Sequence, residues 1–117
     1  MFLERLSKIS SRIEGAQALS LVARDGMPVE SFSSSSELDL EMLAAELISQ
    51  ARAISDDHRE LSVGEVQQFS VTTDRYTFMV SAVSADYYLL LVLGERGNYG
   101  RARFELRRAR LLFEGDL

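Results

Sequence analysis

Hydrophobic side chains first recur along this chain with a helical period. Apolar residues with polar residues between them follow one another at intervals of three or four: Phe2, Leu6, Ile9 and Ile13. This spacing places them on one face of an α-helix. Gly15 follows where a helix C-cap would lie, so the pattern predicts a first helix over residues 2–14.

Two strands joined by a tight turn are predicted next. Residues 17–24 and 27–32 are strand-like. The Asp25-Gly26 pair between them is typical of a type I′ hairpin turn, in which both central residues have positive φ. Pro28 has no backbone N–H to donate to a neighbouring strand, so the second strand is expected at an edge of the sheet.

The following pattern predicts a long amphipathic helix and then a series of strands. Ser36-Glu37-Leu38-Asp39 resembles a capping box with Asp in place of Glu at the third position, so a second helix is expected over residues 38–55. Residues 56–60 are polar and predict a loop. Three strand-like segments and a final helix follow, with the ranges 64 or 65–72, 76–83, 87–93 and 99–113.

The last strand limits how these elements can be arranged. Residues 87–93 are apolar on both alternating faces, so both sides of this strand must be covered. The short links between the strands imply antiparallel neighbours. The order α-β-β-α-β-β-β-α therefore predicts a three-layer α/β/α domain of the α+β type with one five-stranded antiparallel sheet, spanning residues 1–117 as a single domain.

Composition and charge narrow the class of protein. The 117 residues include 46% hydrophobic and 26% charged side chains, as in folded globular proteins. The net charge of −5 disfavours nucleic-acid binding, although residues 96–117 carry six basic and three acidic side chains. The sequence contains neither a signal-peptide core nor an apolar run of membrane-spanning length. We therefore expect a cytoplasmic protein without integral membrane association.

The sequence contains no recognisable catalytic motif. The chain has no cysteine, and its single histidine, His58, lies in the polar stretch with no predicted partner. The motifs GxxxxGK[ST], HExxH and GxSxG are absent. Asp56, Asp57 and Glu60 do not have the spacing of a calcium loop. We expect no catalytic residue, no metal site and no cofactor, and hence a non-enzymatic function.

The second helix has an unusual outer face. On a helical wheel its core stripe comprises Leu40, Leu43, Ala44, Leu47, Ala51 and Ile54. The opposite face carries small and apolar side chains flanked by charged ones: Met42, Ala45, Ser49 and Ala53, with Glu41, Glu46 and Arg52. Alanine is a good helix former, which explains this composition without a function. Alternatively, the face lets a second helix approach closely and is an interface.

The third helix presents a similar choice. Its core stripe comprises Ala102, Leu106, Ala109 and Phe113, while Phe104 and Leu111 lie on the other side, surrounded by arginines that include Arg107 and Arg108. In one interpretation, Phe104 and Leu111 pack laterally against the first helix and the arginines extend to solvent. In the other, Phe104, Arg107, Arg108 and Leu111 form a docking patch for an acidic partner or an anionic lipid.

Three segments in this order resemble the Roadblock family, also called dynein light-chain Roadblock proteins. The first is the predicted hairpin of residues 15–29, with its Asp-Gly turn. The second is the amphipathic helix after the serines. The third is the apolar strand that leads through a glycine turn into residues 101–109. The resemblance implies a Roadblock fold, which is profilin-like.

The resemblance also implies a homodimer, or a heterodimer with a related Roadblock subunit. In such dimers the central helices pack together and the third strands, here residues 65–72 with Phe69 and Val71, join two sheets into one. In bacterial gliding-motility regulators of the MglB type, the paired helices form a platform for a Ras-like small GTPase. The dimer promotes GTP hydrolysis there by reshaping the GTPase. This chain ends at Leu117, so a function carried by a longer C-terminal extension is not expected.

Two other functions remain open from the sequence. One is a dimeric adaptor subunit of a cytoskeletal or signalling complex that has no effect on nucleotide hydrolysis. The other is a small-molecule sensor, because α/β/α domains with curved antiparallel sheets often hold ligands. A buried polar cavity would favour the sensor, whereas a solid core with a groove across a dimer seam would favour protein binding.

Overall fold

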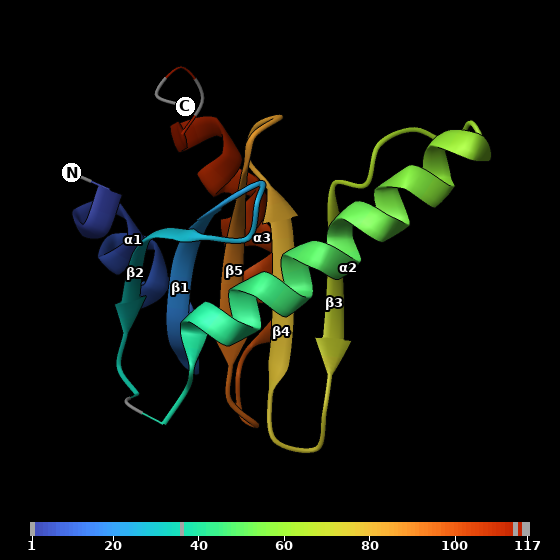
Figure 1. The fold of residues 1–117 in the computed structure, drawn as a ribbon. Helices are drawn as coiled ribbons and strands as arrows, with labels where there is room; N and C mark the ends of the chain where they lie inside the picture. Colours follow the sequence, from blue (N-terminus) through green and yellow to red (C-terminus); the bar gives the residue numbers. More distant parts are fainter. Residues whose placement is uncertain (1, 36, 114, 116–117) are drawn as a thin grey trace.

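The computed structural model describes residues 2–35, 37–113 and 115, apart from the side chains of residues 57–59. One five-stranded sheet lies between helices on its two faces (Figure 1). The elements in chain order are α1 (Phe2–Ser11), β1 (Ala16–Ala23), β2 (Pro28–Ser33), α2 (Leu40–Glu60), β3 (Gln68–Thr72), β4 (Thr77–Ala82), β5 (Tyr87–Leu93) and α3 (Tyr99–Phe113). The predicted three-layer α/β/α architecture is confirmed.

The sheet has the strand order β2-β1-β5-β4-β3, and every neighbouring pair is antiparallel. β5 occupies the centre, with Leu91 opposite Leu19 of β1 on one side and opposite Met79 of β4 on the other. Because its side chains alternate between the two faces, the continuous apolar sequence of β5 contributes to the core on both sides of the sheet. Residues 87–93 therefore form the predicted strand.

The two faces of the sheet bury separate cores. Leu89, Leu91 and Leu93 of β5 point toward α1 and α3, where they pack with Leu6, Ile9, Leu106 and Phe113. Leu90 points the other way and packs with the buried face of α2, namely Ala44, Leu47, Ile48 and Ala51. This arrangement leaves α2 alone on its side of the sheet, with its outer face uncovered (Figure 1).

The hairpin at the start of the chain is present, but its turn differs from the predicted type. Gly26 has a φ of 93°, whereas Asp25 is not among the residues with positive φ, so the turn is not type I′. Instead, the Met27 N–H donates to Asp25 Oδ1 at 3.0 Å, which lets an aspartate in an ordinary conformation stabilise the turn. The expected edge position of the strand containing Pro28 is confirmed.

The predicted boundaries of α2 are wrong at both ends. The helix begins at Leu40, and the Met42 N–H donates to Asp39 Oδ1 at 3.1 Å, so Asp39 is the N-cap. Ser36, the expected cap, lies outside the described residues. The helix also includes residues 56–60, which were expected to form a loop, because no residue there interrupts helical hydrogen bonding. It ends before Ser62, whose φ of 56° is left-handed.

Three further elements are shorter than predicted, and β4 (predicted over 76–83) lacks only one residue at each end. α1 ends at Ser11 rather than residue 14, although Ile13 in the following turn is still buried. β3 begins at Gln68 rather than residue 64 or 65. Among the described residues, no helix is both long enough and apolar enough to cross a membrane.

Candidate partner-binding surface

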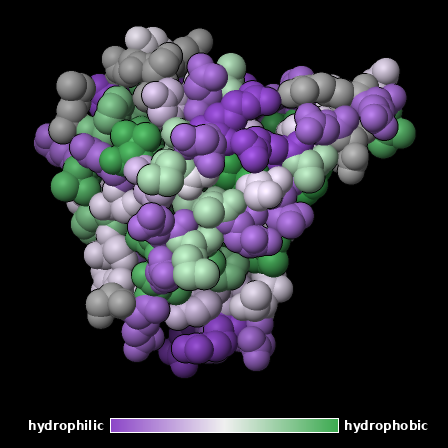
Figure 2. Space-filling model, viewed as in Figure 1, coloured by the Kyte–Doolittle hydropathy of each residue, from purple (hydrophilic) through white to green (hydrophobic). Residues whose placement is uncertain are grey.

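The outer face of α2 is exposed along its whole predicted length. Met42 keeps 70% of its surface accessible, and the other residues of this face are also exposed: Glu41, Ala45, Glu46, Ser49, Arg52 and Ala53. Figure 2, viewed from this side, shows hydrophobic residues among the charged ones over the path of α2. The helical wheel therefore separated the two faces correctly, but its core stripe omitted Ile48, which is fully buried.

A groove runs beside the N-terminal half of α2. Its volume is about 760 Å³, and Phe78 of β4 forms part of the wall opposite the helix. Met42, Ala45 and Ser49 line it from the outer face of α2. Three carboxylates also border it: Glu37, Asp39 and Glu46. The groove thus combines an apolar floor with an acidic margin. The sequence did not predict that Phe78 lies here, because its position beside α2 depends on the order of the strands in the sheet.

The first hairpin holds α2 in place near this groove. Gly26 lies against Ala45, so that a Cβ on the glycine would come within 3.2 Å of the Ala45 Cα. Further along the helix, Arg52 Nη1 donates to the carbonyl oxygen of Arg24 at 3.4 Å. Together with the Asp39 cap, these contacts fix the helix at several points, and a surface on a fixed helix is better preorganised for binding.

The outer strand β3 borders the same face of the molecule. Phe69 and Val71 lie opposite Val80 and Phe78 of β4, which places all four side chains on the α2 side of the sheet. Phe69 is half-buried and Val71 is exposed. Within the described residues β3 pairs only with β4, so its other edge has free backbone groups that another strand can bind.

The C-terminal part of α2 extends past β3 rather than lying over the sheet (Figure 1). Immediately after this helix, Leu61 and Val63 are both largely exposed. These two residues add apolar surface next to the edge strand of the sheet.

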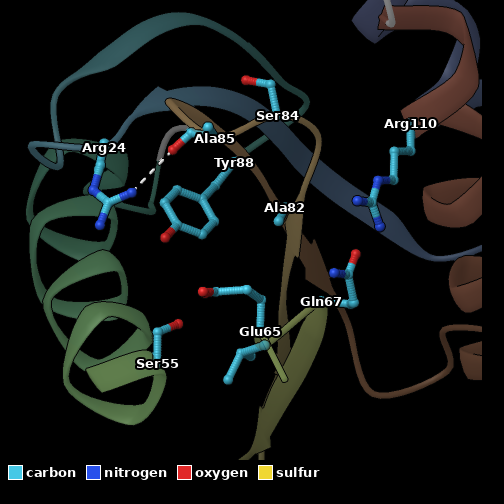
Figure 3. A pocket seen from close by; sticks show the side chains of 10 residues that line it. Arg24, Ser55, Glu65, Gln67, Ala82, Ser84, Ala85, Tyr88 and Arg110 are labelled. Atoms are coloured by element: carbon cyan, nitrogen blue, oxygen red, sulfur yellow. Dashed lines mark hydrogen bonds between the residues drawn. The ribbon is translucent and has the colours of Figure 1, made fainter. Parts of the chain in front are cut away.

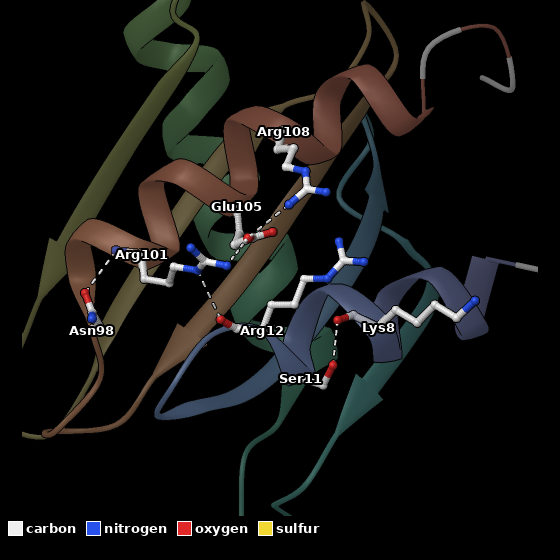
Figure 4. Close-up of polar contacts among 7 residues, drawn as sticks. All are labelled: Lys8, Ser11, Arg12, Asn98, Arg101, Glu105 and Arg108. Atoms are coloured by element: carbon white, nitrogen blue, oxygen red, sulfur yellow. Dashed lines mark hydrogen bonds and ion pairs between the residues drawn. The ribbon is translucent and has the colours of Figure 1, made fainter.

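Phe104 and Leu111 do not pack against α1, as one interpretation expected. They are 54% and 70% exposed and lie on the outer side of α3. Arg107 is also exposed, whereas Arg108 turns toward α1 and pairs with Glu105 (Figure 4). The four residues of the expected docking patch therefore do not all face one surface.

Glu105 is a buried charged residue that the sequence analysis missed. Only 1% of it is accessible, and its Oε1 atom lies 2.9 Å from Arg101 Nη2 and 3.6 Å from Arg108 Nη1. Arg101 Nε in turn donates to the carbonyl oxygen of Arg12, in the turn after α1 (Figure 4). Glu105 lies on the Ala102–Leu106–Ala109 stripe, so a helical wheel that included charged residues would have predicted its burial.

A polar pocket of about 330 Å³ lies between α2 and the end of the sheet. Figure 3 shows Ser55, Glu65 and Tyr88 pointing into it, and Arg24 Nη1 beside them donates to the carbonyl oxygen of Ala85 at 3.1 Å. Ser55 is 9% exposed, so this residue is largely buried. A polar pocket of this kind is the feature that the small-molecule sensor alternative requires.

Of the residues considered for catalysis and metal binding, Asp56 and Glu60 are exposed in the last turns of α2. The His58 and Asp57 side chains lie outside the described residues, although both positions belong to the last turns of α2. Among the described residues, no group of three or more His, Asp or Glu side chains is placed to hold a metal ion.

Comparison with known proteins identifies close structural relatives. No family model and no curated protein sequence matches the chain. Among solved structures, MglC from Myxococcus xanthus is 32% identical, with a TM-score of 0.72 over 99% of this chain and 98% of that one. A Roadblock/LC7 domain from Streptomyces avermitilis has a TM-score of 0.85 at 15% identity, covering 95% and 92% of the two chains. The gliding protein MglB from Thermus thermophilus has a TM-score of 0.83 at 21% identity, covering 92% and 81%.

Proposed function

Because the chain belongs to the Roadblock/LC7 family, we propose that it forms a homodimer that binds a Ras-like small GTPase and modulates its nucleotide cycle. The observation that carries this proposal is the exposed apolar face of α2 with its groove, next to the free edge of β3. The proposed dimer seam and partner platform comprise Glu41, Met42, Ala45, Glu46, Ser49, Arg52 and Ala53, with Phe69 and Val71 at the joined sheets.

Small side chains on α2 and exposed residues just after it support a helix-to-helix seam. Ala45, Ser49 and Ala53 have small side chains, which allow two helix axes to approach closely. A two-fold axis brings the same face of both copies together, so one suitable face is enough to form the contact. The exposed Leu61 and Val63, beyond the edge of the sheet, would be covered by the second copy.

The free edge of β3 supports a second contact in the same dimer. Pairing of two β3 strands would satisfy the backbone groups of both edges and make one continuous sheet. Val71 lies opposite Phe78, so the strand edge adjoins the wall of the α2 groove. A single dimer can therefore use the helix face and the strand edge together.

The groove supports the binding of a further protein. Met42 and Phe78 offer apolar contacts, while Glu37, Asp39 and Glu46 border the groove with negative charge. We expect the bound surface to combine apolar residues with basic ones. The effect on the nucleotide cycle is conformational, with no catalytic residue donated, and it requires a difference in affinity between the GDP and GTP forms.

Titration calorimetry and a hydrolysis assay test this function. A Ras-like small GTPase from the same cells is loaded with GDP or with a non-hydrolysable GTP analogue and titrated with the wild-type protein. We expect at least tenfold tighter binding of one form and a changed hydrolysis rate. Ala45→Arg should lose both effects, because it places a charge in the seam. The matched variant Gln50→Arg adds the same charge on an exposed flank of α2 and should retain them.

Two results would contradict parts of the proposal. Equal affinity for both nucleotide forms with an unchanged rate would reject regulation and favour the adaptor alternative. Loss of binding in Gln50→Arg as well as Ala45→Arg would show that general charge, rather than the seam, determines the interaction.

A further inference from the structure

The arginines of α3 form two groups with different surroundings. Arg101 and Arg108 lie on the flank toward α1, where Glu105 neutralises part of their charge (Figure 4). Arg103, Arg107 and Arg110 lie on the opposite flank and line a cleft of about 450 Å³ between α3 and the strands β3 and β4. The docking patch expected from the sequence combined Arg107 with Arg108, whereas the structure places these two arginines in different groups.

The three arginines of the cleft are not neutralised within the described part of the chain. Among the described residues, no carboxylate lines the cleft, and none of the three arginines forms an ion pair. Their spacing of four and three residues places them side by side on one flank of the helix, where like charges repel one another. Each guanidinium retains several N–H donors for an external acceptor.

The floor of the cleft is polar. Gln68 of β3 and Ser81 of β4 are paired in register, and Ser81 lies two residues from Met79, which faces the α1–α3 core. Gln68 and Ser81 therefore point to the α3 side of the sheet. Both line the cleft and offer hydrogen-bonding groups beneath the arginines.

We propose that this cleft binds an acidic segment of a partner protein, with Arg103, Arg107 and Arg110 pairing with its carboxylates. Guanidinium groups match carboxylates in bidentate geometry, and a row of three favours several acidic residues in succession. Phe104 and Leu111 are exposed on the adjacent outer side of α3, where apolar residues of the same segment can pack. The cleft is complete within one chain, so this inference does not depend on the proposed dimer.

Charge and shape favour a peptide over two other anionic partners. The net charge of −5 repels nucleic acid and an anionic membrane, since both bring a large negative surface close to the whole protein. A narrow acidic segment meets only the basic flank of α3. A cleft recessed between a helix and a sheet is also poorly placed to contact a flat bilayer.

Fluorescence anisotropy tests the proposal with a labelled peptide of glutamates and interspersed leucines. We expect saturable binding to the wild-type protein that weakens as salt is added. Arg107→Glu, which reverses one charge inside the cleft, should bind at least tenfold more weakly. The matched control Arg96→Glu reverses an exposed arginine in the turn before α3 and should change the affinity less than twofold. Circular dichroism of each variant checks that the fold is retained.

Several outcomes would overturn the inference. An equal loss of affinity in Arg96→Glu would mean that net charge, not the cleft, attracts the peptide. Equal or tighter binding of a single-stranded oligonucleotide or of phosphatidylserine vesicles would reject an acidic peptide as the preferred ligand. Ala45→Arg should bind the peptide as the wild type does, so failure of the dimer and failure of this inference are distinguishable.

Discussion

Two glycines allow the turns before β1 and before α3 to touch. Gly15 has a φ of 85°, and a Cβ built on it would lie 2.4 Å from Gly97 Cα, far inside van der Waals contact. Gly94 N–H donates to the Gly15 carbonyl oxygen at 3.0 Å, and Asn98 N–H donates to that of Glu14 at 3.0 Å. The contact therefore joins the start of the sheet to the start of α3.

Replacing Gly15 with alanine should destabilise the protein strongly. A non-glycine residue in a left-handed conformation costs about 1–2 kcal/mol by itself, and the clash with Gly97 must be relieved in addition. We expect Gly15→Ala to lower the free energy of unfolding by about 3 kcal/mol or more, measured by urea denaturation. Gly64→Ala is the matched control, because Gly64 also has a positive φ but nothing lies within 4 Å of its Cβ position. Equal costs for the two variants would show that the contact with Gly97 is unimportant.

At the scale of elements, β5 and α3 are the strand and the helix that the apolar pattern predicted most accurately. The ranges 87–93 and 99–113 coincide with β5 and α3, because turn residues bound both segments and their apolar periodicity is clear. The end of α2 was not predictable from polarity. Residues 56–60 are polar because they lie on a helix that extends beyond the sheet, not because they form a loop.

The candidate surfaces were predictable only in part. The exposed face of α2 follows from one helix alone, so the wheel identified Met42 and Ala45 correctly as exposed. The groove wall at Phe78 and the arginine cleft at Gln68 and Ser81 depend on β3 and β4 lying at one end of the sheet. Strand order depends on contacts between residues that are far apart in the sequence. Without the strand order, the sequence does not show that Phe78, Gln68 and Ser81 lie beside a helix.

The cap of α2 provides a prediction at the same scale. Asp39 Oδ1 accepts the Met42 N–H, which would otherwise be one of the unpaired donors of the first turn. Asp39→Ala should lower the free energy of unfolding by about 1 kcal/mol, and Asp39→Asn should restore most of the loss. Thermal and urea denaturation followed by circular dichroism measure both. A neutral effect of Asp39→Ala would mean that tertiary packing, not the cap, determines where α2 begins.

For the whole molecule, the proposed dimer makes stability depend on protein concentration. When a folded dimer unfolds to two separate chains, higher concentration favours the folded state. An unfolding enthalpy of about 0.7 kcal/mol per residue, or about 160 kcal/mol for two chains, predicts a rise in Tm of about 3 °C for each tenfold increase in concentration. Calorimetry over a hundredfold concentration range measures this slope.

Two variants of α2 test whether the proposed seam causes the dependence of Tm on protein concentration. Ala45→Arg should sediment as a single chain and have a Tm that does not change with concentration, because the arginine prevents the two helices from approaching. Gln50→Arg should retain the dimer mass and the wild-type slope, since position 50 is exposed on the flank of the helix. A wild-type protein that sediments as a monomer, with a Tm independent of concentration, would contradict the dimer. A dimer that persists in Ala45→Arg would instead place the interface on the β3 edge alone.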